Sequence, residues 1–255
     1  MPVDSISLAV FRSLFEAAAE EMGVTLQRAA FSPNIRERLD FSCALFDGDA
    51  RMIAQAAHIP VHLGSMPASV EAAISAFPDL ALGDVIVLND PYSGGTHLPD
   101  VTMVSPVFVD DMVQFYVASR AHHADIGGMS PGSLPLSTEL YQEGLIIPPI
   151  KLVEAGWRNE AVMRLLTANS RAPQERLGDF EAQLAAQRIG ERRLLAIIAA
   201  HGLRAANEHA AALLDTSRRM TEAVIASIPN GVYSFADALE SDGQREFLIP
   251  IRVTI

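Results

Sequence analysis

The stretch DVIVLNDPYSGGTHLPDVTMVSPVFVDDMVQFYVAS, from Asp84 to Ser119, decides the fold. Its segments VIVLND, VTMVSPVFV and MVQFYVAS are short runs rich in β-branched and aromatic residues, which is typical of strands. Asp110-Asp111 separates the last two runs, so we expect them to pair antiparallel across a tight turn. The loop PYSGGTHLPD joins the first two runs and is rich in Gly, Pro and polar side chains. Because sites are often built on loops held by strands, this hairpin is where we expect the function.

The segments before this centre predict one helix, a hairpin and a second helix. From Ser7 to Met22, apolar residues recur at steps of three and four, the stripe of an amphipathic helix, and Gly23 is a natural stop. DFSCALFDGDARMIAQ predicts two short strands around Asp47-Gly48-Asp49. VHLGSMPASVEAAISAF predicts a loop that leads into a helix.

The segments after it predict an irregular cover, a helical hairpin and a final strand. Residues 127–149 carry many Gly, Pro, Ser and Thr, which favours an ordered loop over the sheet edge. Two helical patterns follow, 174–200 and 203–228, broken at His201-Gly202. REFLIPIRVTI alternates like a half-buried strand, and no partner strand follows it. The expected core of the helical hairpin is Leu177, Phe180, Leu184, Leu194, Ile198, Leu213, Leu214, Val224 and Ile228.

These segments together predict an α+β fold in three regions. Residues 1–172 form a β-rich, site-bearing region with an N-terminal amphipathic helix, and residues 173–230 form the helical hairpin. Residues 231–255 begin a further β region, which we expect to be truncated.

Composition narrows the class of protein. With 255 residues and 49% hydrophobic content, the chain can bury a sizeable core. Thirty-one acidic against nineteen basic residues give a net charge of −12, the wrong sign for binding nucleic acid or an anionic membrane surface. The apolar runs are too short to span a bilayer, and the N-terminus lacks a secretory pattern. We therefore expect a cytoplasmic protein that binds neither nucleic acid nor membrane.

For some single residues we expect a structural role and not a catalytic one. Cys43 alternates within FSCALF and is expected in the core rather than as a nucleophile. Lys151 is the only lysine and follows IIPPI in a structural segment, so lysine catalysis is not expected. The chain has no GxxxxGK[ST] and no strand-to-helix GxGxxG, so if ATP is used we expect another polypeptide to bind it.

Histidine and carboxylate groups gather around the central hairpin. Five of the seven histidines fall between His58 and His123, and the densest polar groups are HLPD at 97–100 and RAHHAD at 120–125. Both residue types are usual ligands of divalent metals. Asp100 precedes one strand and His122 follows the other, so the antiparallel hairpin should bring them together. His122 and His123 should point to opposite faces, so one of them is a ligand, and the other, or Asp125, supports it.

Three alternatives stay open from the residues alone. Histidines in Gly-rich loops often only hydrogen-bond the backbone. His58 and His62, in AHIPVHLGS, either orient a substrate or pack the turn before a helix. Glu37 and Asp40, in NIRERLDFS, are either a solvated charge run or a source of a carboxylate for the site.

Four longer motifs carry a resemblance to a known family. SPNIRERLDFSCALFD, GDVIVLNDPYSGGTHLPDV, SRAHHADIGGMSPGS and STELYQEGLIIPP occur in this order, and RLGDFEAQLAAQRIGERRL and IPNGVYSFAD follow. In these motifs the chain resembles the N-terminal portion of hydantoinase B/oxoprolinase proteins, which include subunits of ketone carboxylases.

The resemblance implies a B-type subunit of an ATP-dependent cyclic-amide hydrolase. A hydantoinase A-type partner would bind ATP and activate the substrate, and this subunit would complete ring opening of a 5-oxoproline or a hydantoin. The implied ligands of a divalent metal (Mn, Zn or Fe) are Glu37, His97, Asp100 and His122, with His123 and Asp125 in catalytic support. The alternatives are a ketone-carboxylase subunit and a truncated, non-catalytic interaction fragment.

Overall fold

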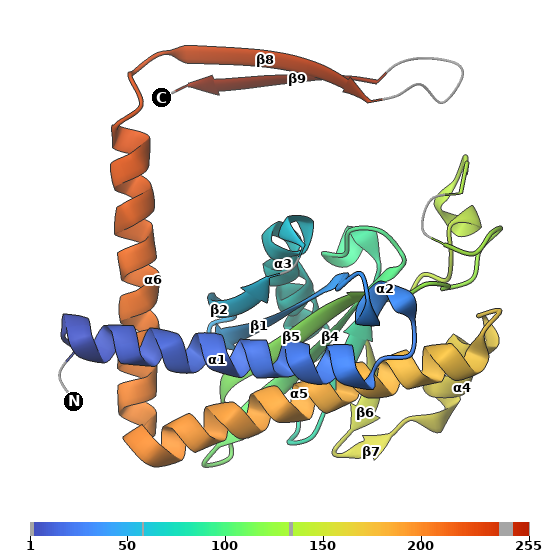
Figure 1. Ribbon diagram of the computed structural model, residues 1–255, viewed down its shortest axis with the longest axis horizontal. Coiled ribbons are helices and arrows are strands. Elements are labelled where there is room, and N and C mark those ends of the chain that lie inside the picture. The colour runs from blue at the N-terminus through green and yellow to red at the C-terminus, as the bar shows by residue number, and fades with distance from the viewer. Residues whose placement is uncertain (1–2, 58, 133–134, 240–246, 255) are drawn as a thin grey trace. The chain divides into compact units, whose positions relative to one another are not determined.

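The computed structural model describes residues 3–57, 59–132, 135–239 and 247–254, and its elements confirm the α+β class (Figure 1). Its contacts divide the chain into two compact units, Met1–Ala210 and Ala211–Ile255. The helices are α1 (Ser5–Ala29), α2 (Pro33–Arg36), α3 (Pro60–Ala76), α4 (Glu160–Ala168), α5 (Pro173–His201) and α6 (Leu203–Ala226), with short 3₁₀ turns η1 (Pro91–Ser93) and η2 (Leu140–Gln142). The strands are β1 (Phe41–Asp47), β2 (Met52–Ala57), β3 (Val85–Leu88), β4 (Asp100–Val109), β5 (Met112–His122), β6 (Ile150–Glu154), β7 (Trp157–Arg158), β8 (Val232–Leu239) and β9 (Phe247–Thr254).

The first unit is built on an antiparallel sheet in the order β2-β1-β5-β4-β3-β6-β7. The predicted central hairpin is confirmed, because β4 and β5 pair from Asp100 opposite His122 to Val109 opposite Met112. The turn residues between them, at positions 110 and 111, both have positive φ, 51° and 60°. A two-residue turn with this conformation matches the twist of the strands, and aspartate tolerates it better than most residues.

The predicted β1–β2 hairpin is confirmed as well, and it adds to the central hairpin. β1 pairs with β5 along its whole length, from Phe41 opposite Ala121 to Asp47 opposite Phe115. One residue before β1, the carbonyl of Asp40 accepts a hydrogen bond from the backbone N–H of His122 at 2.9 Å. Strand pairing therefore fixes Asp40 beside the end of β5.

Each face of the sheet is covered by helices. On one face, Met66 and Val70 of α3 pack against Val104 of β4 in one buried cluster. On the other face, Phe180 and Leu184 of α5 belong to a second buried cluster. That cluster also contains Val87 of β3 and Val101 and Met103 of β4. Because β5 alternates, Arg120 and His122 point to the α3 face and Ser119 points to the α5 face.

The N-terminal helix α1 lies alongside α5 (Figure 1). Asp4 caps α1, since its carboxylate accepts from the backbone N–H of Ser7 at 2.7 Å. The expected apolar stripe is buried, with Phe11, Phe15 and Met22 at 1% exposure or less. The predicted helix is therefore confirmed, although it continues past Gly23 to Ala29.

One expected boundary differs in the structure, and one irregular segment is confirmed. The helix α3 begins at Pro60, so the predicted loop VHLG forms its first turns. Proline at the first helical position has a favourable φ and no N–H to leave unpaired. Between residues 127 and 149 the described chain is irregular apart from η2, as the Gly and Pro content predicted.

The C-terminal part corrects two further expectations. The helices α5 and α6 break at Gly202, as predicted, and Phe180 and Leu194 of α5 are buried. The predicted core residues of α6 are not buried, and Val224 is 65% exposed. The final strand does have a partner, because β9 pairs antiparallel with the preceding β8. None of the described helices combines the length and apolar composition that a membrane-spanning segment needs.

Candidate metal centre

The start of β4 and the end of β5 supply the centre of a polar cluster. Asp100 and His122 are direct partners in the antiparallel ladder, so their side chains lie on the same face. Asp100 is fully buried, and its Oδ1 lies 3.1 Å from Nδ1 of His122. The meeting of these two residues was predicted from the hairpin.

The loop between β3 and β4 adds two more polar side chains to Asp100. Oδ2 of Asp100 accepts a hydrogen bond from the hydroxyl of Thr96 at 2.6 Å and lies 3.0 Å from Nδ1 of His97. The loop folds back over α3 at Gly94, whose φ is 82°. A Cβ there would collide with the backbone of Ala68, so this close approach requires glycine.

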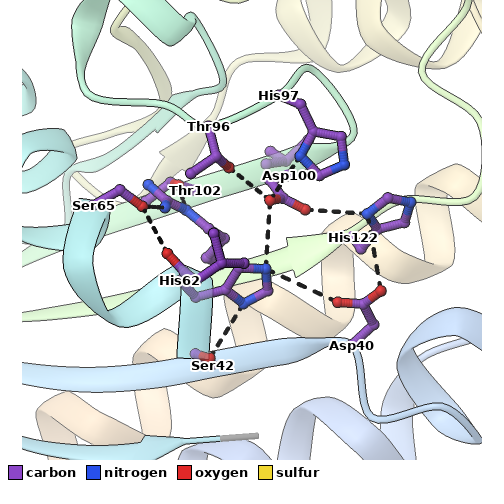
Figure 2. Close-up of polar contacts among 12 residues, drawn as sticks. Asp40, Ser42, His62, Ser65, Thr96, His97, Asp100, Thr102 and His122 are labelled. Atoms are coloured by element: carbon purple, nitrogen blue, oxygen red, sulfur yellow. Dashed lines mark hydrogen bonds and ion pairs between the residues drawn. The ribbon is translucent and has the colours of Figure 1, made fainter. Parts of the chain in front are cut away.

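Two further residues complete the cluster from elements distant in sequence. His62, in the first turn of α3, is buried and has its Nε2 3.4 Å from Oδ2 of Asp100. Its Nδ1 lies 3.2 Å from the hydroxyl of Ser42 on β1. The carboxylate of Asp40 lies 3.9 Å from both His62 Nε2 and His122 Nδ1. Figure 2 shows His62, His97, His122 and Asp40 grouped around Asp100.

The environment of Asp100 favours its charged form. Burial by itself raises the pKa of this carboxyl, but hydrogen bonds with His122, His62 and His97 outweigh burial and hold the pKa below its ordinary value. The hydrogen bond to Asp100 also raises the pKa of His97. A carboxylate that stays ionised among imidazoles is a suitable centre for a cation.

A buried arginine lies beside the cluster on the same face. The guanidinium of Arg120 donates to Thr102 Oγ1 at 2.8 Å, to Ser69 Oγ at 2.6 Å and to Ser65 Oγ. Burial lowers its pKa to about 10, and the charge of Asp100 opposes that shift. Arg120 therefore fastens α3 to the strands, and its charge balances part of the negative charge of the cluster.

The donor set fits a divalent metal. One atom each from His97, Asp100 and His122 lies within 4.8 Å of the others. Imidazole nitrogen with carboxylate oxygen suits Zn, Mn or Fe, and three protein ligands leave positions open for water or substrate. The structure thus brings together three of the four residues that the resemblance implies as ligands.

The fourth residue, Glu37, is not part of this group of three. It caps the C-terminus of the short helix α2 and is exposed to solvent. Among the described residues, the carboxylate that reaches the histidines from this segment is Asp40. The sequence signal for Asp40 was its position immediately before a predicted strand. Because that strand, β1, pairs with β5, Asp40 lies beside the end of β5.

The two predicted supporting residues lie away from the cluster. His123 faces α5, where its Nε2 lies 2.9 Å from Oε1 of Gln183 and its ring packs on Phe180. Burial lowers the pKa of His123 to about 4. His122 and His123 thus take opposite sides, as the strand alternation predicted.

Asp125 joins the loop after β5 to the start of α5. Its carboxylate accepts hydrogen bonds from the backbone N–H of Gly127 at 3.0 Å and of Arg171 at 2.5 Å. It also accepts from the Ser170 hydroxyl at 3.2 Å and forms an ion pair with the Arg171 side chain. Burial raises the pKa of this carboxyl, but these hydrogen bonds outweigh it and lower the pKa.

The remaining candidates have structural environments. Cys43 is buried in β1, and burial raises the pKa of its thiol. Lys151 forms an ion pair with Asp84 at 2.9 Å. Of the two histidines in AHIPVHLGS, His58 lies outside the described residues. The other, His62, lies inside the cluster.

Comparisons with known proteins identify relatives of this chain. A family model described as hydantoinase B/oxoprolinase matches residues 4–255. The chain is 42% identical to 5-oxoprolinase 1 of Arabidopsis thaliana, over 78% of this chain and 17% of that protein. It is 39% identical to the caprolactamase subunit beta of Pseudomonas jessenii, over 94% of this chain and 42% of that one.

A solved structure extends the comparison to the fold. The crystal structure of the ATP-dependent caprolactamase from Pseudomonas jessenii superposes with a TM-score of 0.93 and 38% identity. The match covers all of this chain and 45% of that chain. The chain therefore spans less than half the length of these relatives.

Proposed function

The chain belongs to the hydantoinase B/oxoprolinase family, and we propose that it forms the metal-bearing part of a B-type subunit of an ATP-dependent cyclic-amide hydrolase. The observation that carries this proposal is the convergence of His97, Asp100 and His122 at one end of the β4–β5 hairpin. The similarity to a 5-oxoprolinase and to a caprolactamase subunit supports the substrate class.

In this proposal, Asp100 is the central ligand. Its two oxygens lie against different histidines, Oδ1 against His122 and Oδ2 against His97, so the three side chains are held in position by one another. The carboxylate of Asp40 takes the fourth position in place of Glu37, because it lies 3.9 Å from His122. A bound Mn, Zn or Fe ion would polarise a substrate oxygen.

The surrounding residues hold the ligands and handle protons. His62 bridges the two carboxylates through Nε2, and its Nδ1 is held by Ser42, so the ring orientation is fixed. Asp40 is the more exposed carboxylate, with a side chain 21% accessible against 1% for Asp100. The Oδ atom of Asp40 that does not serve as a ligand would accept a proton from water during ring opening.

In this proposal, His123 and Asp125 act from the α5 side, where they hold the end of β5 and the following loop in place. The hydrogen bond from His123 to Gln183 anchors the end of β5, and with it the preceding residue His122, to α5. Asp125 holds the following loop against the start of α5. Their proposed contribution to catalysis is therefore the positioning of the strand end.

ATP enters the proposal through a partner. The chain contains no GxxxxGK[ST] phosphate loop, so we assign ATP binding and activation of the amide carbonyl to a hydantoinase A-type subunit. The substrate is a small cyclic amide such as 5-oxoproline, a hydantoin or a lactam. The working complex is then a cytoplasmic hetero-oligomer.

The test combines metal content with turnover. The chain is purified alone and together with an A-type partner, and bound metal and ATP-dependent hydrolysis of 5-oxoproline and caprolactam are measured. We expect about one divalent metal per chain, and a loss of turnover of ~100-fold or more for His97→Ala and His122→Ala, since each removes a ligand. His201→Ala, outside the cluster, is the matched control and should keep both properties. Full metal content and turnover in His122→Ala would contradict the proposal.

A further inference from the structure

A second site of interest lies on the opposite face of the sheet from the metal cluster. There, a cavity of about 110 Å³ lies between α5 and the strands, and its lining includes Val85, Ser105, Val153, Leu184, Gln187 and Glu191. This volume has room for several water molecules or a small organic group. A wider and more open hollow of about 380 Å³ shares the lining residues Val153, Gly156, Leu184 and Arg188 with it and reaches Trp157. The two hollows are therefore neighbours, and we call the smaller one the chamber and the wider one its mouth.

Two buried oxygen atoms of the chamber residues have no hydrogen-bond partner among the described residues, Ser105 Oγ and Gln187 Oε1. The amide orientation of Gln187 is set by its nitrogen, which donates to Met103 O at 3.1 Å and to Ser119 Oγ at 2.9 Å. Gln187 therefore offers an acceptor that its own surroundings do not use. A buried acceptor without a donor is energetically unfavourable.

One turn earlier on α5, Gln183 has a similar arrangement in which the amide oxygen also has a hydrogen-bond partner. Its nitrogen donates to Val101 O at 3.0 Å and to Ser119 Oγ at 3.4 Å. Its oxygen is 2.9 Å from His123 Nε2, which donates to it. The two glutamines differ at the amide oxygen: that of Gln183 has a protein donor, whereas that of Gln187, whose side chain lines the cavity, has none among the described residues.

The other groups at the chamber define the ligand. Glu191 lies one turn after Gln187 and has no ion-pair partner in the part of the chain that the structure describes. Burial raises the pKa of Glu191, as it does for a carboxyl that lacks a cation. Arg188 is exposed, so water screens its charge. The walls contributed by Val85, Val153 and Leu184 are apolar.

We propose that this chamber binds a small primary ammonium compound, whose three N–H groups donate to Gln187 Oε1, Ser105 Oγ and the Glu191 carboxylate. The short apolar body of the ligand packs against the valines and Leu184. An ammonium group matches the chamber because it brings donors and positive charge together, and the residues supply acceptors and negative charge.

The test uses n-butylammonium chloride as the probe and 1-butanol as its neutral counterpart. Trp157, the only tryptophan, is 82% exposed at the mouth, so its fluorescence reports on this site. Titrations at constant ionic strength are followed by this fluorescence and by calorimetry. We expect saturable one-to-one binding of n-butylammonium, with 1-butanol ~10-fold weaker or more.

Two variants weaken the set of acceptors, one by removing a hydroxyl and the other by removing a charge. Ser105→Ala deletes an unpaired hydroxyl, and Glu191→Gln removes the charge of a half-buried side chain. Each should weaken n-butylammonium binding by ~5-fold or more. Glu71→Gln, an exposed change on α3 across the sheet, is the matched control and should bind as the unmodified chain does. Absence of saturable binding, equal binding of 1-butanol, or unchanged binding in both variants would overturn the proposal.

Discussion

The two faces of the sheet bury similar polar side chains but use them differently. On the α3 face, His97, His122 and Asp100 direct their ligating atoms toward one another. On the α5 face, Gln183 pairs with His123 Nε2 and with the backbone carbonyl of Val101, and His123 Nδ1 has no hydrogen-bond partner among the described residues. Burial of polar groups is therefore common to both faces, and the convergence of metal-ligating atoms distinguishes the α3 face.

The neighbouring residues His122 and His123 show the contrast within one strand end. His122 lies 3.1 Å from an ionised carboxylate, whereas burial lowers the pKa of His123 to about 4. A histidine held neutral by its surroundings and hydrogen-bonded to an amide is suited to packing. Variants on the α3 face should therefore change metal binding, and variants toward α5 should change stability.

The largest effect on metal binding is expected for Asp100→Asn. The substitution keeps the size of the side chain and removes the charge shared by three histidines, so affinity for Zn²⁺ or Mn²⁺ should fall by ~100-fold or more. Calorimetric titration of the metal-free chain measures this, with circular dichroism to verify the fold. Affinity within a few-fold of the unmodified chain would remove Asp100 from the centre of the account.

A smaller effect separates the two acidic candidates of the NIRERLD segment. Asp40→Asn should weaken metal binding by ~10-fold, because its carboxylate lies 3.9 Å from two histidines. Glu37→Gln is the matched control, since Glu37 is exposed, and its affinity should change by less than ~2-fold. The opposite order of effects would restore Glu37 as the ligand.

The smallest effect on metal binding, with a clear effect on stability, is expected for Asp125→Asn. It should lower the free energy of unfolding by ~2 kcal/mol at pH 7, because a buried carboxylate that accepts several hydrogen bonds loses its charge. The folded-state pKa of Asp125 is depressed, so this stabilisation is present above the ordinary aspartate pKa of 3.8 and is lost as the pH falls through the lower folded pKa.

Urea unfolding at pH 7 and near pH 3 checks this prediction. The difference between the unmodified chain and Asp125→Asn should shrink at the lower pH, and metal affinity at pH 7 should be unchanged. A constant difference would show that the charge of Asp125 does not provide the stabilisation.

Much of the first unit could be predicted from local sequence. The turn at Asp110-Asp111 and the alternation of the flanking runs predicted the β4–β5 hairpin, and the hairpin in turn predicted that Asp100 meets His122. Because His97 lies only three residues before Asp100, its proximity to Asp100 could be predicted as well. These contacts are local, so periodicity and turn chemistry are enough to predict them.

The residues that sequence reasoning did not place depend on distant pairing. Asp40 reaches the site because β1 pairs with β5, and His62 reaches it because α3 begins at Pro60 and packs on that face. Val224 was expected in a core from its helical spacing, but spacing indicates an apolar stripe and not what covers it. The final strand, β9, was expected to lack a partner because no strand follows it in the chain. Its partner, β8, precedes it instead.

The adjacent histidines provide the most direct test of the central claim. Metal content and Mn²⁺ or Zn²⁺ affinity are measured for the unmodified chain, His122→Ala and His123→Gln. We predict about one metal per chain, lost in His122→Ala and retained in His123→Gln, with lower stability in the latter. Retention of metal in His122→Ala, or equal loss in both variants, would contradict the assignment of a metal centre to the α3 face.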